Sequence, residues 1–224
     1  MAVGPHPDDV EIGAGGVLYK TSHQGKKNII IDLTPSQMST HGDVQTRLQE
    51  SQHAAKVLGV HHRKNLMLED GHICDDCASR VALAREIRTR KPEILLMPRK
   101  EDRHPDHECA AELVKNAVFL AWLSKKDIYW LAPHKPRLLL YYMIRQNIDP
   151  DLIIPLTELE YTTKMKAFGS YVSQADTNER GLEYVRSRHI VHGHEIGTQY
   201  GEWYKLYSHS VGVQSFDDVM SGFF

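Results

Sequence analysis

The sequence predicts an α/β fold: a three-layer, Rossmann-like domain in which a mainly parallel sheet carries helices on both faces. Apolar runs of strand length alternate with longer segments of helical periodicity, a pattern typical of βαβ construction. The alternation is clearest in the first half of the chain. With 224 residues and 41% hydrophobic content, residues 1–224 are expected to form a single domain.

Each expected element follows from a local pattern. Gly25 and Gly59 end the first two helices, Asp75 or Asp76 can cap the third, and Pro92 stops it. In chain order the expected elements are strand 2–4, helix 16–24, strand 28–33, helix 44–58, strand 65–68, a helix ending at residue 90, strand 93–97, helix 108–121, strands 137–144 and 152–154, and helices 156–171 and 182–195.

Composition excludes several classes of function. The net charge is -2 and no long run of Lys or Arg occurs, so nucleic acid is not expected as a partner. No stretch approaches the roughly 20 apolar residues of a membrane span, and the start MAVGPHPDDVE lacks the features of a signal peptide. Three cysteines are too few for a disulfide framework. These features predict a cytoplasmic protein with reduced thiols and no membrane partner.

Two loops rich in His and Asp follow buried strands of the predicted sheet. They are residues 5–13 (PHPDDVEIG) and residues 98–107 (PRKEDRHPDH). Ligands of open α/β sheets collect at the carboxyl ends of the strands, so both loops should face one crevice. Imidazole and carboxylate suit a hydrolytic zinc ion, which usually takes three protein ligands and keeps one position for water. One His-Pro-Asp tripeptide is also an ordinary turn, but the two together indicate a metal site.

The two loops resemble those of the LmbE-like or PIG-L de-N-acetylases, through HPDDVEIGAGG at 6–16 and HPDH at 104–107. Similarity extends to residues 46–60, to the strand EILLMP, and to residues 180–204. The last segment is most similar to the bacillithiol-biosynthesis branch, which deacetylates N-acetylglucosaminyl malate. The resemblance implies a zinc-dependent hydrolase that removes the acetyl group from the nitrogen of an N-acetylated sugar.

The resemblance implies one Zn²⁺ per chain, with another divalent metal as the alternative, bound by His6, Asp9 and His107. The residue types agree with this, because two imidazoles and one carboxylate leave a fourth position for water. Zinc lowers the pKa of bound water to about 7, and a free carboxylate beside it can take the remaining proton. Asp8 is the expected general base.

His104 lies on the same loop as one of the implied ligands. We expect it to stabilise the tetrahedral oxyanion or to protonate the leaving amine, in its protonated form, with Asp106 orienting its ring. Family similarity also implies that Arg47 binds substrate and that Tyr200 assists the oxyanion. For Arg47 the alternative is a helix-surface ion pair with Glu50 or Glu11. Arg103, with its neighbours Arg99 and Lys100, is expected to bind the malate carboxylates. The alternative is that these three cationic side chains are solvated loop charges.

Three other motifs carry weaker signals. Cys74 and Cys77 have CxxC spacing, but no second pair accompanies them. A second metal site at His189, His192 and His194 is less expected than a surface or pocket-rim cluster. The glycines at 13–16 lack the full dinucleotide-binding pattern, so no nicotinamide cofactor is expected.

Three further expectations concern the start of the chain, its assembly and the competing functions. Family members usually carry several more residues before HPDD, so either the protein begins upstream or its first strand is short. Related proteins form homo-oligomers, often hexamers, and the resemblance implies the same here. The alternatives are an amidohydrolase acting on another N-acyl sugar or a mycothiol-type conjugate, and a non-catalytic metal- or sugar-binding protein.

Overall fold

The structure, a computed structural model, describes residues 1–144 and 149–207, and for residues 175–180 it describes the backbone alone. A seven-stranded sheet forms its centre, in the spatial order β3-β2-β1-β4-β5-β7-β6. The first five strands in that order are parallel, and β7 runs antiparallel to both β5 and β6. The strands are β1 (Ala2–Gly4), β2 (Ile29–Asp32), β3 (His62–Asn65), β4 (Ile94–Pro98), β5 (Leu138–Tyr142), β6 (Leu152–Leu156) and β7 (Tyr200–Leu206).

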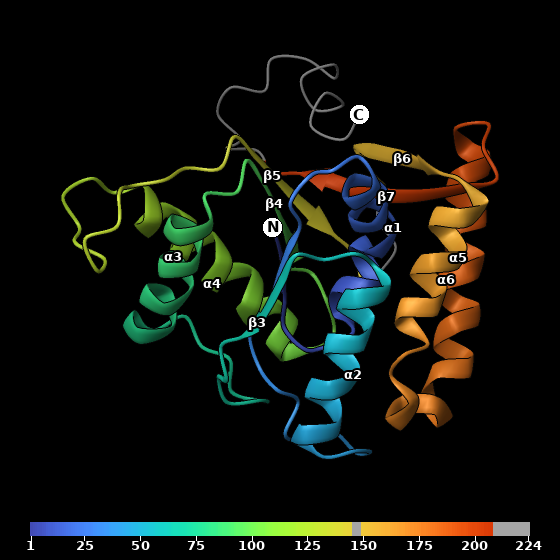
Figure 1. Ribbon diagram of the computed structural model, residues 1–224, viewed down its shortest axis with the longest axis horizontal. Coiled ribbons are helices and arrows are strands. Elements are labelled where there is room, and N and C mark those ends of the chain that lie inside the picture. The colour runs from blue at the N-terminus through green and yellow to red at the C-terminus, as the bar shows by residue number, and fades with distance from the viewer. Residues whose placement is uncertain (145–148, 208–224) are drawn as a thin grey trace.

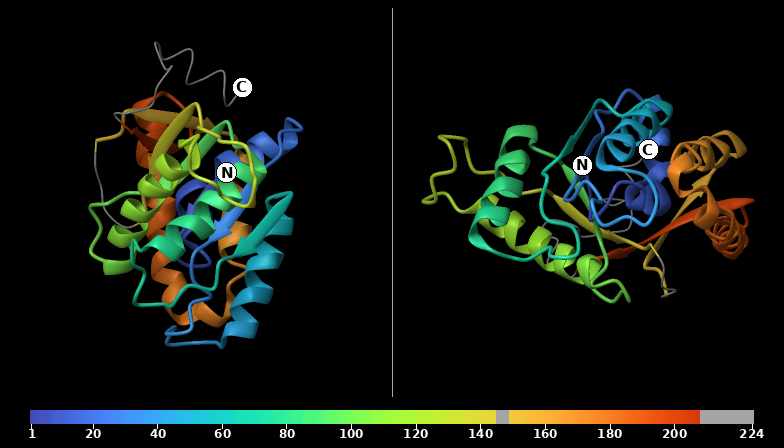
Figure 2. Two further views of the ribbon diagram at one scale, coloured as in Figure 1. Left: turned by 90° about the vertical axis from the view of Figure 1, so that its left-hand side faces the viewer. Right: turned by 90° about the horizontal axis from the view of Figure 1, so that it is seen from below.

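Helices cover both faces of this sheet. One face carries α3 and α4, and the other carries α1, α2, α5 and α6, so that the molecule has three layers (Figures 1 and 2). The predicted α/β fold with a mainly parallel sheet is therefore confirmed. The helices are α1 (Asp9–His23), α2 (Val44–Val57), α3 (Cys77–Arg90), α4 (Pro105–Trp122), α5 (Glu158–Phe168) and α6 (Ala175–Glu195), and a short 3-10 turn, η1 (Val172–Gln174), precedes α6.

The central strands are apolar along their whole length because both of their faces are buried. In β4, Leu95 and Met97 point into the core beneath α3 and α4, whereas Leu96 packs on the side of α1. In β1, Val3 packs on the side of α3 and α4, and Ala2 packs on the side of α1. Each face thus has its own hydrophobic core, and the loops at the strand ends are held between two packed layers.

Side-chain caps fix where several helices begin. Asp76 accepts a hydrogen bond from the backbone N–H of Ser79, which confirms one of the two caps expected for α3. Thr157 and Glu160 form a reciprocal capping box at the start of α5. Such caps satisfy backbone N–H groups that have no partner inside the helix.

Helix α1 begins seven residues before the expected start at Gly16. Asp9 is its first residue, and its glycines are helical because neighbouring layers approach them closely. A Cβ on Gly13 would lie 2.0 Å from Cδ2 of Tyr142, and a Cβ on Gly16 would lie 2.4 Å from Cδ1 of Leu156. Tertiary packing therefore outweighs the low helix propensity of glycine, and the second half of the HPDD motif lies at a helix N-terminus.

Several other elements differ from the sequence prediction, and helix α6 begins at Ala175 instead of residue 182. Strand β3 covers residues 62–65 instead of 65–68, because its register against β2 pairs His62 with Ile29. Strand β7 was not predicted, although it joins β5 to β6 inside the sheet. None of the helices in the described ranges is long and apolar enough to cross a membrane.

Candidate metal and catalytic site

The loops after β1, β2, β3 and β4 enclose a pocket of about 400 Å³ at the carboxyl edge of the sheet. This is the edge at which both His/Asp loops were expected to meet. Its volume is in the range of small-molecule sites. The pocket is lined by His6, Asp8, Asp9, Ser36, Met38, Ser39, Thr40, Arg47, Asp70, Gly71, His104, His107 and Gln174.

His6, Asp9 and His107 come together in this pocket although about 100 residues separate the two loops. Oδ2 of Asp9 lies 3.1 Å from Nδ1 of His6 and 3.4 Å from Nε2 of His107. One ligand atom from each of the three residues lies within 4.8 Å of the others, as a metal site requires. His6, His104 and Asp106 meet the same distance condition, so the two sets share His6.

A second layer of carboxylates contacts the outer nitrogens of two imidazoles. Nε2 of His6 lies 3.0 Å from Oδ1 of Asp70 and 3.3 Å from Oδ2 of Asp106. Nδ1 of His107 lies 3.2 Å from Oδ2 of Asp102. Carboxylates in this position commonly fix the tautomer and orientation of a metal-binding histidine. The rings of His6 and His107 thus direct Nδ1 and Nε2, respectively, toward Asp9.

The carboxylates create a site that favours positive charge. Burial lowers the pKa of His107, but the charge of Asp9 and the hydrogen bond to Asp102 raise it to about 9. Burial raises the pKa of Asp9, but the charge of His107 and hydrogen bonds from both imidazoles hold it well below its ordinary value. A divalent cation would supply the same positive charge between these groups.

Asp8 has an unusual backbone conformation at the start of α1. Its φ of 109° is rare for a residue with a side chain and is typical of strained functional positions. Burial and the charge of Asp9 raise the pKa of its carboxyl group to about 6, although Arg47 and His6 oppose the shift. A carboxylate with this pKa can both accept and release a proton near neutral pH.

Arg47 is buried and projects from α2 toward Asp8. Its Nη2 donates to the backbone oxygen of Pro7 at 2.6 Å and to Oδ2 of Asp8 at 3.1 Å. Its Nε and Nη1 have no hydrogen-bond partner among the described residues. The surface ion pair considered as an alternative is not formed, because Glu11 binds Arg63 and Glu50 binds Ser173. The guanidinium group therefore has two buried nitrogens without a partner among the described residues, while the residue itself lines the pocket.

His104 differs from its expected state. The backbone N–H of Asp106 donates to Nδ1 of His104 at 3.2 Å, which leaves the ring proton on Nε2. Burial and the charges of His107 and His6 lower the pKa of His104. The lowered pKa favours the neutral ring with Nε2–H as its donor, whereas the protonated form was expected.

The expected role of Asp106 also changes. Its carboxylate does not orient His104; it contacts His6 and accepts hydrogen bonds from the backbone N–H groups of Gly71 and Ile73, at 2.7 and 3.3 Å. Asp106 therefore joins the loop after β3 to the implied ligand His6. Only its backbone N–H bonds to the ring of His104.

Two expected substrate-binding residues lie outside this pocket. Tyr200 is at the start of β7, where its ring stacks on Tyr161 with 3.9 Å between the centroids. Its register against Leu156 of β6 places it in a separate apolar cluster. Arg103 is exposed and does not line the pocket. Arg99 and Lys100 do not line the pocket either, so Arg47 alone of the residues expected to bind substrate does.

Asp70 and Asp102 were missed by the sequence analysis. Asp70 belongs to no recognisable motif, and its relation to His6 appears only when β3 is placed two strands away from β1. Asp102 precedes HPDH by two residues, and a charged residue in a loop is ordinarily solvated. Its buried position beside His107 could have been inferred only from the three-dimensional arrangement of the loop.

The cysteine pair and the late histidine cluster lie away from the pocket. Cys74 and Cys77 are both exposed free thiols before and at the start of α3. His189, which belongs to α6, is buried beside Lys164 and Glu202, whereas His194 is exposed. Neither motif contributes a residue to the pocket lining.

The sequence is similar to that of known proteins over much of its length. Residues 1–118 match the sequence model of the PIG-L family, described as GlcNAc-PI de-N-acetylase. The chain is 29% identical over 218 residues to a diacetylchitobiose deacetylase of Thermococcus kodakarensis, covering 90% of this chain and 80% of the relative.

Two solved structures share the fold over nearly the whole chain. The conserved protein TT1542 of Thermus thermophilus superimposes with a TM-score of 0.87 at 30% identity, covering 93% of this chain and 96% of its own. The N,N'-diacetylchitobiose deacetylase of Pyrococcus horikoshii superimposes with a TM-score of 0.84 at 25% identity, covering 97% and 87%.

Proposed function

Because the chain belongs to the PIG-L family, we propose that it is a metal-dependent deacetylase that hydrolyses the acetamide of an N-acetylated sugar. One observation carries this proposal: Asp8, with a pKa of about 6, lies directly beside the triad of His6, Asp9 and His107. A site that only bound a metal or sugar would have no need of this additional carboxyl group. Metal-assisted amide hydrolysis combines a Lewis acid with a nearby base.

The residues fit a zinc ion in number, type and environment. His6, Asp9 and His107 would hold it. The carboxylates of Asp70 and Asp102 would fix the orientation of the two imidazoles, through the ring nitrogens that do not face Asp9. When bound, zinc supplies Lewis acidity for the acetyl carbonyl and lowers the pKa of water. The acidic surroundings that raise the pKa of His107 support the placement of a cation here.

The remaining side chains have separate roles in the proposed reaction. Asp8 accepts the proton of the attacking water and is then able to transfer it to the leaving amine. His104 donates from Nε2 to the oxyanion that forms when the acetyl carbonyl is attacked. Arg47 lines the pocket, where it binds a sugar oxygen, and its charge limits the rise in the pKa of Asp8.

Two substrates represent the narrower alternatives. We propose N-acetylglucosaminyl malate, the substrate implied by the resemblance to the bacillithiol branch. The deacetylases of Thermococcus and Pyrococcus are named for diacetylchitobiose, which makes that disaccharide the competing substrate. Arg47 is the Lys or Arg residue that lines the pocket among the described residues, so it is the group proposed to bind a malate carboxylate.

Acetate release tests the proposal directly. Metal-stripped protein would be assayed with and without added zinc on N-acetylglucosaminyl malate, N,N'-diacetylchitobiose and N-acetylglucosamine. Zinc-dependent release from at least one of them supports a deacetylase, and the ratio of kcat/KM values identifies the substrate class. Absence of zinc-dependent release from all three by folded, zinc-loaded protein would contradict the proposal.

A further inference from the structure

A cavity of about 560 Å³ lies between the edge strand β3 and helix α3. It is formed by the end of β3, by one face of α3 and by one residue of the segment that joins α4 to β5. It shares no residue with the candidate metal site, and the deacetylase proposal gives it no role. The lining residues are Lys64, Asn65, Leu66, Cys77, Ala78, Val81, Ala82, Arg85, Glu86 and Tyr129.

Small and apolar side chains line the part of the cavity next to α3. Ala78 and Ala82 are four residues apart and therefore lie on the same face of this helix. Val81 and Leu66 add apolar surface beside them. An apolar surface with a few polar groups is the usual composition of a site for a small organic molecule.

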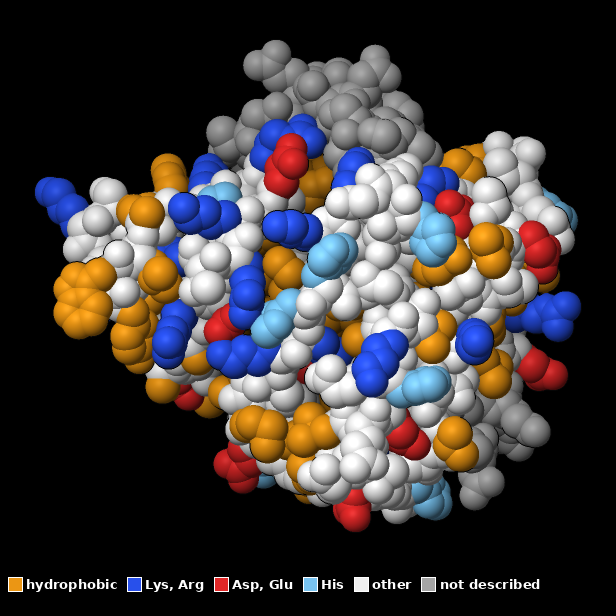
Figure 3. Space-filling model, viewed as in Figure 1, with side chains coloured by type: hydrophobic (Ala, Val, Ile, Leu, Met, Phe, Trp, Pro, Cys, Tyr) orange, Lys and Arg blue, Asp and Glu red, His pale blue; other side chains and the backbone are white. Residues whose placement is uncertain are grey.

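Tyr129 adds an aromatic wall from a separate segment, residues 123–137. Figure 1 places this segment at the left-hand end of the molecule, where Figure 3 shows hydrophobic side chains beside Lys and Arg. Tyr129 and Trp130 have φ angles of 51° and 56°, which bulky residues rarely adopt. The backbone N–H of Trp130 donates to Oδ1 of Asp127 at 2.9 Å, and Ile128 is buried. The turn that presents the tyrosine ring is therefore held in place.

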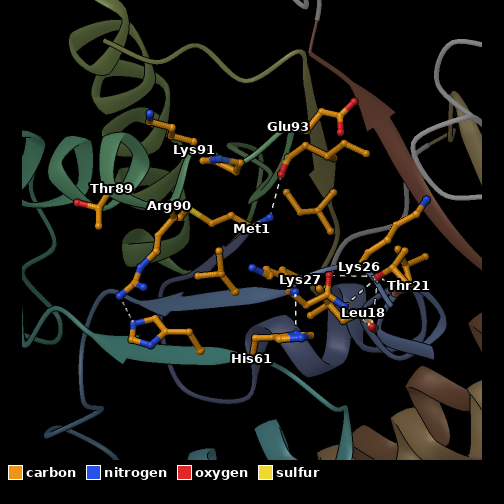
Figure 4. Close-up of a pocket in the computed structure, with 17 residues that line it drawn as sticks. Met1, Leu18, Thr21, Lys26, Lys27, His61, Thr89, Arg90, Lys91 and Glu93 are labelled. Carbon is orange, nitrogen blue, oxygen red and sulfur yellow. Dashed lines mark hydrogen bonds between the residues drawn. The ribbon is translucent and has the colours of Figure 1, made fainter. Parts of the chain in front are cut away.

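The carboxylate of the lining, Glu86, is already paired with other cations. Nζ of Lys64 lies 2.5 Å from its Oε1, and Nε of Arg90 lies 3.6 Å from its Oε2. Arg90 lies outside the lining, where its Nη2 also donates to Nε2 of His62 at 2.8 Å (Figure 4). Glu86 therefore has no charge left to compensate a further cation of the cavity.

Arg85 is that further cation. It has no carboxylate partner among the described residues, and its Cζ lies 4.5 Å from the centroid of the Tyr129 ring. The lining thus contains two cations, Lys64 and Arg85, and one carboxylate, that of Glu86. This excess of positive charge favours an anionic ligand.

We propose that this cavity binds a small aromatic anion. The aromatic body packs between the apolar face of α3 and the ring of Tyr129, because aromatic rings prefer stacked or edge-to-face contacts. The guanidinium group of Arg85 holds the anionic group, since its planar set of N–H donors matches two oxygens of a carboxylate, sulfonate or phosphate. A neutral aromatic molecule, or an anion without an apolar body, satisfies only one of the two surfaces.

Calorimetric titration of the zinc-loaded protein tests both parts of the proposed ligand. The probes are naphthalene-2-sulfonate, the neutral methyl 2-naphthyl sulfone, and methanesulfonate. They carry no carboxylate, imidazole or thiolate, the usual ligands of zinc, so the metal site is not expected to bind them. We expect naphthalene-2-sulfonate to bind more tightly than either of the other two probes.

Three variants and one control locate the bound probe. Arg85→Gln should weaken the binding of naphthalene-2-sulfonate by about tenfold or more, because it removes charge-assisted hydrogen bonds. Tyr129→Ala should weaken it by about two- to tenfold, the usual contribution of an aromatic contact. Ala82→Leu should weaken it by filling the cavity. Arg186→Gln removes the same charge as Arg85→Gln from an exposed position on α6, outside the cavity, and should leave the Kd unchanged.

Several results would overturn the inference. Absence of naphthalene-2-sulfonate binding would remove the site itself. Equal affinity of Arg85→Gln and Arg186→Gln, or an unchanged Kd for Ala82→Leu, would place the probe elsewhere on the protein. Binding of the sulfone or of methanesulfonate as tight as that of naphthalene-2-sulfonate would show that one of the two surfaces plays no part. Deacetylase activity is not the readout, so failure here and failure of the proposed function are distinguishable.

Discussion

Arg47 and Asp8 form a direct contact across the pocket, with Nη2 of the guanidinium 3.1 Å from Oδ2 of the carboxylate. The contact joins α2 to the residue that precedes α1, and it opposes the rise in the pKa of Asp8 caused by burial and by Asp9. Arg47 therefore has two effects, one on the substrate and one on the base. The two effects can be separated experimentally.

Replacing Arg47 with Met should raise the pKa of Asp8 above about 6. In the wild type, kcat/KM should rise with pH up to about 6 and then level off, because Asp8 acts as a base only when it is ionised. In Arg47→Met this acidic limb should move to higher pH. Arg47→Lys keeps a positive charge and should shift it less. An acidic limb at the same pH in all three proteins would contradict this electrostatic role.

Replacing Asp8 with Asn should lower kcat by roughly 10²- to 10⁴-fold, the usual contribution of a general acid–base group. The variant should retain its zinc, because Asp8 is not one of the three proposed ligands. Mass spectrometry of bound metal and acetate release would be measured on the same samples. Asp149→Asn, an exposed control, should behave as the wild type does. Loss of metal together with activity would make Asp8 a ligand instead of a base.

The sequence was sufficient for the parts of the site that depend on strand ends. Parallel strands bring their carboxyl ends to one edge, so the two His/Asp loops were expected to meet. The choice of His6, Asp9 and His107 within them followed from the family resemblance. The structure brings the three residues together, and Arg47 also reaches the pocket.

The rest depended on long-range arrangement. Tyr200 was misplaced because its position is set by the pairing of β7 with β6, and an antiparallel strand inserted within the sheet has no signal in the βαβ pattern. The tautomer of His104 depends on one backbone hydrogen bond, from Asp106. Asp70 and Asp102 act through contacts of 3.0 and 3.2 Å that no residue spacing reveals.

Replacing Asp102 with Asn should weaken zinc binding by about 10- to 100-fold, because its carboxylate contacts Nδ1 of His107 and fixes the orientation of that ring. The variant should regain activity when zinc is added in excess, since Asp102 does not touch the substrate pocket. Competition with a zinc-binding dye would give the Kd. Glu108→Gln changes an exposed carboxylate beside His107 and is the matched control. An unchanged Kd for Asp102→Asn would remove the residue from the metal site.

A buried ion pair between α5 and β7, formed by residues that do not line the pocket, should contribute to stability and not to catalysis. Nζ of Lys164 lies 2.5 Å from Oε1 of Glu202, and neither side chain is exposed. Glu202 also accepts hydrogen bonds from the backbone N–H groups of Gly16 and Val17 in α1. The pair therefore joins α5 and β7 to the helix that carries Asp9.

Removing one partner of such a pair leaves an uncompensated buried charge, so Lys164→Met should lower the free energy of unfolding by about 3–5 kcal/mol. Lys166→Met, at an exposed position on the same helix, should change it by less than about 0.5 kcal/mol. Urea denaturation at neutral pH would measure both. Equal stability of the two variants would show that Glu202 does not need this partner.

The pH dependence of the same difference provides a second check. Burial raises the pKa of Glu202, but the charge of Lys164, together with the charge of His189 and the hydrogen bonds from both residues, lowers it from 4.5 to about 2. A carboxylate with a lowered pKa in the folded state stabilises the fold above its unfolded pKa, and the effect is lost as pH falls toward 2. The difference between wild type and Lys164→Met should therefore be largest above pH 4.5 and should shrink below it, because protonation neutralises Glu202 in both proteins. A difference that stays constant between pH 7 and pH 3 would assign the effect of the variant to packing instead of charge.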